Sequence, residues 1–191
     1  PPDYAAQRKT NLLGKVVRLN LDGSVPADNP FAGGRPGQDA IWTYGHRNPQ
    51  GLAVNPVTGT LFELEHGPLG GDELNVARRG GNSGGRVVWW GKTYDGPPVG
   101  SGKPPQPGRA DSIRHWTPVI APGGFAFYSG AAFPAWRGDI LIAGLASQAL
   151  VHLDMSGDRV VSERRWPGRL GRRFRAVAIG PDGRVYVAPD E

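Results

Sequence analysis

Residues 51–65 read GLAVNPVTGTLFELE, and this stretch decides the fold class. Two short apolar runs, 52–55 and 61–65, flank a turn that contains Pro56 and Gly59. Alternating apolar residues around such a turn are typical of a β-hairpin. The last residues, 175–191 (RAVAIGPDGRVYVAPDE), repeat the order of strand, Pro- and Gly-containing turn, strand and acidic end. A hairpin that recurs within one chain indicates a repetitive all-β architecture.

Further strands are expected outside the first hairpin. They cover residues 15–21, 125–128, 139–143, 150–154, 176–179 and 185–188. A weaker repeat relates residues 15–25 (KVVRLNLDGSV) to residues 150–160 (LVHLDMSGDRV). Recurring strand pairs without a long helical pattern predict the blades of a β-propeller, and an open β-sandwich is the alternative. The Pro-rich residues 97–110 (PPVGSGKPPQPGRA) predict a surface loop.

The composition agrees with many short strands and turns. The 191 residues include 30 Gly and 19 Pro, and 38% of them are hydrophobic. The absence of cysteine excludes disulfides, thiolate metal sites and a cysteine nucleophile. The formal charge of +5 is compatible with nucleic acid or with a small polyanionic cofactor. No stretch has the pattern of a membrane span or a signal peptide.

Residues 44–52 (YGHRNPQGL) gather several polar side chains beside a turn. Arg47 presents a planar fork that suits a carboxylate or a quinone oxygen, and Asn48 and Gln50 can donate and accept hydrogen bonds nearby. For His46 we expect a hydrogen-bonded structural role rather than that of a base. The alternative interpretation is a turn with exposed polar side chains.

Residues 65–75 (EHGPLGGDELN) follow about one hairpin later, and we expect both stretches to border one polar site. Gly-Pro and Gly-Gly favour sharp turns that can aim backbone carbonyls at one point. Asp72 and Glu73 add carboxylate oxygens, and carbonyl and carboxylate oxygens are the ligands of calcium. The alternative is a tight connection with solvated acids.

Residues 164–175 (RRWPGRLGRRFR) carry an arginine run that includes Arg164, Arg165 and Arg169. Nucleic-acid binding or a solvated basic loop would each account for much of this run. At the entry to the last hairpin, however, Arg173 and Arg175 should point to one side of a strand and Phe174 to the other. Two parallel guanidinium groups suit a small molecule with several carboxylates.

Together these residues resemble the soluble aldose sugar dehydrogenases that use pyrroloquinoline quinone (PQQ), relatives of the soluble quinoprotein glucose dehydrogenase. The matching segments, in chain order, are GKVVRLNLDGSVPADNPF, IWTYGHRNPQGLAVNP, LFELEHGPLGGDELN, FAFYSG and RFRAVAIGPDGRVYV. The resemblance implies a six-bladed β-propeller of which this chain is roughly the C-terminal half. It also implies a periplasmic or secreted enzyme that oxidises aldoses to lactones and passes electrons to an external acceptor.

The resemblance also implies roles for individual residues. Arg47, Asn48 and His66 would line the quinone, and Arg173 and Arg175 would hold its carboxylates. Gly67 and Pro68 would offer carbonyls to the Ca²⁺ ion that polarises the quinone. Asp72 and Glu73 match ligands of a second, structural calcium.

Several positions depart from the family. Ser83 replaces a tyrosine, Gly85 and Arg86 replace Trp-Pro, Ala176 replaces an acid, and Ala146 lies where some relatives have a cofactor-binding lysine. The family's general-base histidine is expected upstream of this chain, so the sequence predicts no catalytic residue here and no dehydrogenase activity for the chain alone. A non-catalytic propeller module that binds carbohydrate or protein is the alternative function.

Overall fold

The computed structural model describes residues 2–85, 91–92, 96–97, 112–167 and 171–190. The described residues form two short 3-10 helices, η1 (Pro2–Gln7) and η2 (Pro134–Trp136), and a series of strands. The strands are β1 (Lys15–Val17), β2 (Ile41–Tyr44), β3 (Pro49–Val54), β4 (Leu61–Glu65), β5 (Asp72–Val76), β6 (Arg114–Trp116), β7 (Pro122–Phe127), β8 (Ile140–Gly144), β9 (Ala149–Ser156), β10 (Arg159–Pro167), β11 (Phe174–Ile179) and β12 (Val185–Pro189). None of the helices among these residues is long and apolar enough to cross a membrane.

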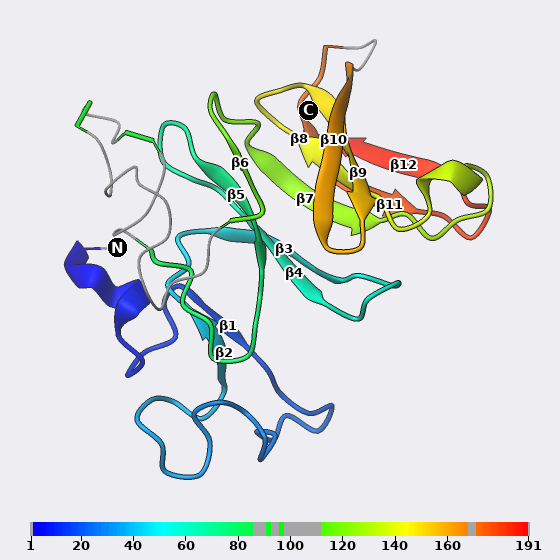
Figure 1. The fold of residues 1–191 in the computed structure, drawn as a ribbon. Coiled ribbons are helices and arrows are strands. Elements are labelled where there is room, and N and C mark those ends of the chain that lie inside the picture. The colour runs from blue at the N-terminus through cyan, green and yellow to red at the C-terminus, as the bar shows by residue number, and fades with distance from the viewer. Residues whose placement is uncertain (1, 86–90, 93–95, 98–111, 168–170, 191) are drawn as a thin grey trace.

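The strands form four antiparallel sheets in which neighbours in the chain are neighbours in space. Two sheets have four strands, β3-β4-β5-β6 and β7-β8-β9-β10, and two have two strands, β1-β2 and β11-β12 (Figure 1). Strand β7 contacts β3 on one side and β11 on the other, so the first strands of three successive sheets lie next to each other. Up-and-down sheets arranged in this way are propeller blades. The predicted all-β propeller fold is therefore confirmed, and the sandwich alternative is wrong.

Most of the expected strands are present, with two kinds of error. The expected hairpins are β3-β4 and β11-β12, each pairing the first two strands of a sheet. Of the expected strand 15–21, residues 18–21 are not a strand, since β1 ends at Val17 and pairs with the unpredicted β2. Strands β5, β6 and β10 were also missed, so Arg164 and Arg165 lie in a strand rather than in a loop. The predicted loop at 97–110 lies, except for Pro97, outside the described residues.

The main hydrophobic core lies between the two four-stranded sheets. Its members are Phe62, Leu64, Leu74, Trp116, Ile120, Phe127, Ile140, Ile142, Val151 and Leu153. The rings of Phe62 and Phe127 meet edge to face with centroids 5.3 Å apart, which joins β4 to β7. Because side chains alternate along a strand, the apolar side of β4 at Phe62 and Leu64 leaves Glu63 and Glu65 on the opposite side, where both are also buried.

Polar contacts between turns hold the blades together. The side-chain amide of Asn55 donates to the Gly157 carbonyl at 3.1 Å, and Asp158 accepts hydrogen bonds from Thr58 and Thr60. The buried Tyr128 hydroxyl donates to the Gly183 carbonyl at 2.6 Å, which connects the second four-stranded sheet to the β11-β12 hairpin. Both contacts join turns of different sheets, so they hold adjacent blades at a fixed spacing.

Candidate functional site

Arg47, Asn48 and His66 lie at one edge of the first four-stranded sheet. Pro49 at the start of β3 pairs with Glu65 at the end of β4, so the residues just before β3 and just after β4 meet. The His66 amide donates to the Asn48 carbonyl at 3.0 Å, and Arg47 Nη1 donates to the His66 carbonyl at 3.1 Å. The structure thus brings the two polar stretches together, as the sequence predicts.

The carboxylate of Glu65 positions this edge, although the sequence analysis did not single it out. Its Oε2 atom accepts the backbone N–H groups of both Arg47 and Asn48. Glu65 is buried, so these charge-assisted bonds are shielded from water. A signal was present in the sequence, because Glu65 immediately precedes the His-Gly-Pro turn and ends an apolar strand.

His66 connects the first four-stranded sheet to the second. Its ring Nε2 lies 2.7 Å from the carbonyl oxygen of Pro122, the first residue of β7. A carbonyl can only accept, so the ring carries its proton on Nε2 in this contact. The next residue, Gly123, lies directly against the backbone of Arg175 in β11, with no room between them for a side chain. Three successive sheets therefore bring Arg47, His66 and Arg175 to the same end of the inner strands β3, β7 and β11.

Arg173 and Arg175 flank the buried Phe174 and point to the solvent side, as predicted. Their side chains are 54% and 48% exposed, and both pair with the carboxylate of Asp190, at 3.2 Å and 2.7 Å respectively. Ion pairs at exposed positions contribute little to stability, so another carboxylate can replace Asp190 at small cost.

The turn that follows His66 is built around Asp72. Oδ1 of Asp72 accepts the Gly67 N–H at 2.9 Å, and Oδ2 accepts the N–H groups of Ile120 and Ala121 at 2.9 and 2.7 Å. Burial raises the pKa of Asp72, and these three hydrogen bonds oppose the shift. The interpretation of Asp72 as a solvated acid is wrong. Its hydrogen bonds give it a structural role, and its role as a calcium ligand stays a prediction.

Gly67 and Pro68 are both buried, and neither carbonyl accepts a hydrogen bond from another described residue. A side chain at position 67 would lie 2.7 Å from the Asp72 nitrogen and closer still to the Gly71 carbonyl, so only glycine fits there. Glu73, on the adjacent strand β5, is buried too, and burial and the neighbouring Glu65 raise its pKa well above the usual range. The acids of this stretch therefore face the protein interior.

The whole described chain matches one family of proteins. Residues 2–191 match the family model described as Glucose / Sorbosone dehydrogenase. The chain belongs to this family. It is 38% identical to aldose sugar dehydrogenase YliI of Escherichia coli (strain K12) over 187 residues, which are 97% of this chain and 50% of that protein.

Solved structures agree with this Glucose / Sorbosone dehydrogenase assignment. A glucose dehydrogenase crystal structure matches with a TM-score of 0.92 at 45% identity, over 97% of this chain and 54% of that one. The PQQ-bound form of the aldose sugar dehydrogenase from Streptomyces coelicolor matches with a TM-score of 0.69 at 31% identity, over 90% of this chain and 44% of that one. The chain spans about half the length of these relatives.

The positions that depart from the family pattern have different surroundings in this Glucose / Sorbosone dehydrogenase chain. Ser83 is buried, and its N–H donates to the Tyr44 carbonyl at 2.9 Å. The Ala146 N–H donates to the Ile120 carbonyl, close to Asp72. Ala176 is exposed next to Arg175, and Arg86 lies outside the described residues. The backbone at Ser83 and Ala146 is thus held in place without the larger family side chains.

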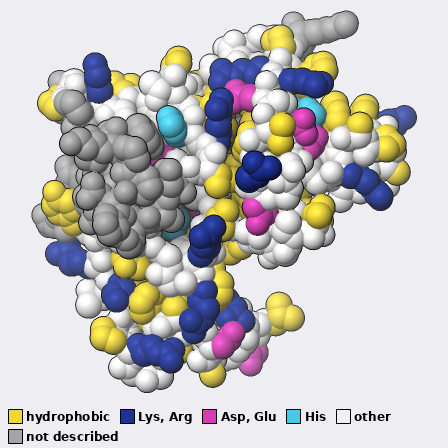
Figure 2. Space-filling view, in the orientation of Figure 1, with side chains coloured by type: hydrophobic (Ala, Val, Ile, Leu, Met, Phe, Trp, Pro, Cys, Tyr) yellow, Lys and Arg dark blue, Asp and Glu magenta, His cyan; other side chains and the backbone are white. Residues whose placement is uncertain are grey.

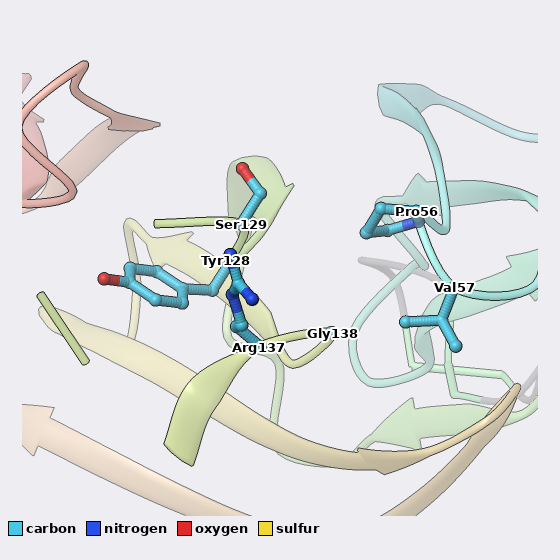
Figure 3. A pocket seen from close by; sticks show the side chains of 6 residues that line it. All are labelled: Pro56, Val57, Tyr128, Ser129, Arg137 and Gly138. Carbon is cyan, nitrogen blue, oxygen red and sulfur yellow. The ribbon is translucent and has the colours of Figure 1, made fainter. Parts of the chain in front are cut away.

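A pocket of about 270 Å³ lies at the opposite end of the strands from these residues. Figure 3 shows its lining residues, with Pro56 and Val57 on one side and Tyr128, Ser129, Arg137 and Gly138 on the other. Strand β3 begins beside His66 and ends at Val54, next to this pocket, and β7 runs in the same sense from Pro122. The pocket therefore lies at the opposite end of β3 and β7, and none of the predicted cofactor residues lines it.

The arginine run does not form one strip. Arg165 in β10 pairs with Glu163 at 2.8 Å, whereas Arg173 and Arg175 share Asp190. Arg169 lies outside the described residues. Figure 2 shows Lys and Arg side chains scattered over the visible face and interrupted by acidic and apolar side chains. This distribution gives a phosphate backbone no continuous track on that face.

Proposed function

We propose that this chain forms the cofactor-binding part of an oxidoreductase that oxidises aldose sugars to lactones with PQQ and Ca²⁺. The observation that carries the proposal is the shared edge, where Arg47, Asn48 and His66 of one sheet meet Pro122 of the next and Arg175 of a third. Membership of the Glucose / Sorbosone dehydrogenase family and the likeness to a PQQ-bound relative support it.

The residues present fit the cofactor. PQQ has three carboxylates, and Arg173 and Arg175 offer two half-exposed guanidinium groups that both pair with Asp190. The carbonyls of Gly67 and Pro68 lie in a buried turn and suit a hard cation such as Ca²⁺. Asp72 and Glu73 remain proposed ligands of a second, structural calcium.

When bound, the quinone supplies a hydride acceptor and Ca²⁺ acts as a Lewis acid on it. The protein's own residues supply placement and charge. The His66 carbonyl accepts a hydrogen bond from Arg47, and Glu65 accepts the N–H groups of Arg47 and Asn48. The rim of the proposed site, formed by Arg47, Asn48 and His66, is therefore preorganised. Arg173 and Arg175 would hold carboxylates of the cofactor, and the Gly67–Asp72 contact keeps the carbonyl turn in shape.

A general base must still remove the proton from the sugar hydroxyl. His46 is buried against Thr43, and His152 is buried against Asp139, with Nε2 to Oδ2 at 2.7 Å. His66 uses its Nε2 on Pro122. His115, the fourth histidine, is exposed in β6. The family resemblance supports the proposal that the base lies outside this chain, and we retain it together with a periplasmic or secreted location and an external electron acceptor.

The test is a titration of PQQ into the purified chain with Ca²⁺ and then with a chelator, followed by quinone absorbance. We expect saturable binding that the chelator abolishes, and at least about tenfold weaker binding for Arg175→Gln, since a charge-assisted contact contributes about 1.5–3 kcal/mol. Arg184→Gln is the matched control, because Arg184 is an exposed arginine in the turn of the same hairpin and pairs with Asp182.

Two outcomes would contradict the proposal. One is the absence of binding by a wild-type chain whose circular dichroism shows it to be folded. The other is equal loss of affinity in both arginine variants, which would indicate a non-specific charge effect. The first outcome would favour the alternative of a non-catalytic propeller module.

A further inference from the structure

Strands β4 and β5 present a buried square of polar side chains. Glu63 pairs directly with Asn75, and Glu65 pairs directly with Glu73. Residues two apart share a face of the sheet, so all four lie on the same side, opposite Phe62 and Leu64. All four are buried, with exposures between 0% and 5%. Three buried carboxylates packed together require compensation by cations or protons.

His46 covers this square and completes a set of potential ligands. Its Nε2 lies 2.7 Å from Thr43 Oγ1, and its Nδ1 lies 3.4 Å from Glu63 Oε2 and 3.7 Å from Glu65 Oε1. One ligand atom each from His46, Glu63 and Glu65 lies within 4.8 Å of the others. If the proton of the imidazole is on Nε2 and Thr43 Oγ1 accepts its hydrogen bond, the lone pair on Nδ1 points at the two carboxylates.

Two atoms of this cluster have no hydrogen-bond partner although they are fully buried. These atoms are His46 Nδ1 and Glu63 Oε1. Asn75 Nδ2 lies 3.1 to 3.4 Å from Glu63, Glu65 and Glu73, but its two hydrogens cannot satisfy three carboxylates. Buried polar atoms without partners are costly, so this arrangement implies something else between the side chains.

A proton on His46 Nδ1 would be the simplest occupant. Burial opposes it, but Glu63 and Glu65 outweigh that effect and raise the pKa of His46 to about 10. A charge-assisted N–H···O bond is, however, about 2.7–2.9 Å long, and the observed separations of 3.4 and 3.7 Å exceed that range. The 3.4 Å separation of His46 Nδ1 from Glu63 Oε2 is instead that of two ligands of one cation. Ligands about 2.1 Å from a tetrahedral metal ion lie about 3.4 Å from one another.

We propose that His46, Glu63 and Glu65 form a binding site for one divalent transition-metal ion such as Zn²⁺. One imidazole nitrogen with carboxylates is a ligand set for such ions, whereas Ca²⁺ takes six to eight oxygens. The Thr43 hydroxyl orients the imidazole from behind, as outer-shell partners do at metal sites. This site uses other ligands than the calcium turn at Gly67 and Pro68. It also differs from the predicted second calcium site at Asp72 and Glu73, although Asn75 Nδ2 contacts both Glu65 and Glu73.

The ion would stabilise the rim directly above it. Glu65 uses Oε1 toward His46 and Oε2 for the N–H groups of Arg47 and Asn48. A cation bound on one side of this carboxylate fixes its orientation on the other. The proposal rests on the buried cluster and not on PQQ binding, so each can fail without the other.

The experiment is a calorimetric titration of Zn²⁺ into the EDTA-stripped and dialysed wild-type chain in excess Ca²⁺, which keeps calcium sites filled. We expect one equivalent to bind. Glu63→Gln should weaken binding by at least about tenfold, since loss of even an outer-shell partner costs about 10–100-fold. Glu163→Gln, the same change in β10 of the other four-stranded sheet, should bind as the wild type does.

A second readout needs no variant. Co²⁺ added to the wild-type chain should give visible d–d bands that Zn²⁺ abolishes. Wild-type affinity in Glu63→Gln would overturn the proposal, and so would a chain folded by circular dichroism that binds neither Zn²⁺ nor Co²⁺. The latter result would show that protons alone neutralise the cluster.

Discussion

Substitution of Gly123 by alanine tests whether the close contact between β7 and β11 positions Arg175. A Cβ atom at this position would lie 2.9 Å from both the carbonyl carbon and the Cα of Arg175, and closer still to its carbonyl oxygen. Ordinary contacts begin near 3.4 Å. Gly123→Ala therefore forces the two backbones apart by at least about 0.5 Å, and overpacking of this kind costs about 1–3 kcal/mol.

Gly124 provides the control within the same strand. A Cβ there would meet only the Arg175 carbonyl oxygen, at 3.9 Å, which is an ordinary contact. Gly124→Ala should change the free energy of unfolding by less than about 1 kcal/mol, with the sign set by the lower chain entropy of alanine. Urea unfolding followed by circular dichroism measures both variants.

The same displacement should affect the proposed PQQ site. Moving β11 moves Arg175 relative to His66, so Gly123→Ala should also weaken PQQ binding, whereas Gly124→Ala should not. Equal stability of the two variants would refute the reasoning, because it would show that β7 and β11 are free to separate. Loss of stability without loss of PQQ affinity would show that the spacing of these strands does not position Arg175.

Two further contacts between blades give testable predictions. Glu163 accepts hydrogen bonds from Arg165, Trp116 and Arg114; burial alone would raise its pKa, but these donors lower it. Glu163→Gln should therefore cost about 1 kcal/mol near neutral pH, and thermal melts should show this difference shrinking as the pH falls below the ordinary glutamate value near 4.5. Tyr128→Phe removes the bonds to the Gly183 carbonyl and the Phe133 N–H, so urea unfolding should show a loss of about 1–3 kcal/mol; an unchanged stability would contradict this.

The hairpins could be predicted because their signals are local. In residues 51–65 the alternation and the Pro-Gly turn lie within 15 residues, and the same holds for β11-β12. Strands β5 and β6 gave no such signal. Most residues between them lie outside the described part of the chain, and their pairing brings Asp72 opposite Trp116 across a long separation in sequence. A strand pair joined by a long connection lacks the turn that makes a hairpin visible.

The rim could be predicted from composition, since Arg, Asn and His beside Gly and Pro stand out in any sequence. Its supports could not. Glu63 and Glu65 lie in LFELE, where strand alternation suggests a solvated polar face, yet both are buried. Whether the second face of a strand meets water depends on what folds over it, and here that cover includes His46 from the preceding turn. No period-2 pattern contains that information.

The contacts between segments couple the spacing of the blades to the positions of the predicted cofactor residues. Each predicted cofactor residue is contacted by a group from another segment. Glu65 accepts the N–H groups of Arg47 and Asn48, and the Pro122 carbonyl accepts from His66. Arg173 pairs with Asp190, and Arg175 lies against Gly123. A change in the spacing of the sheets therefore reaches the rim without touching a ligand. Conversely, a cation at Glu65 would tighten the first sheet and the rim together, because one carboxylate serves both. The free energy of unfolding and the affinity for the proposed cofactor should accordingly change together when β7 moves. Replacement of a surface arginine such as Arg184 should leave that affinity unchanged.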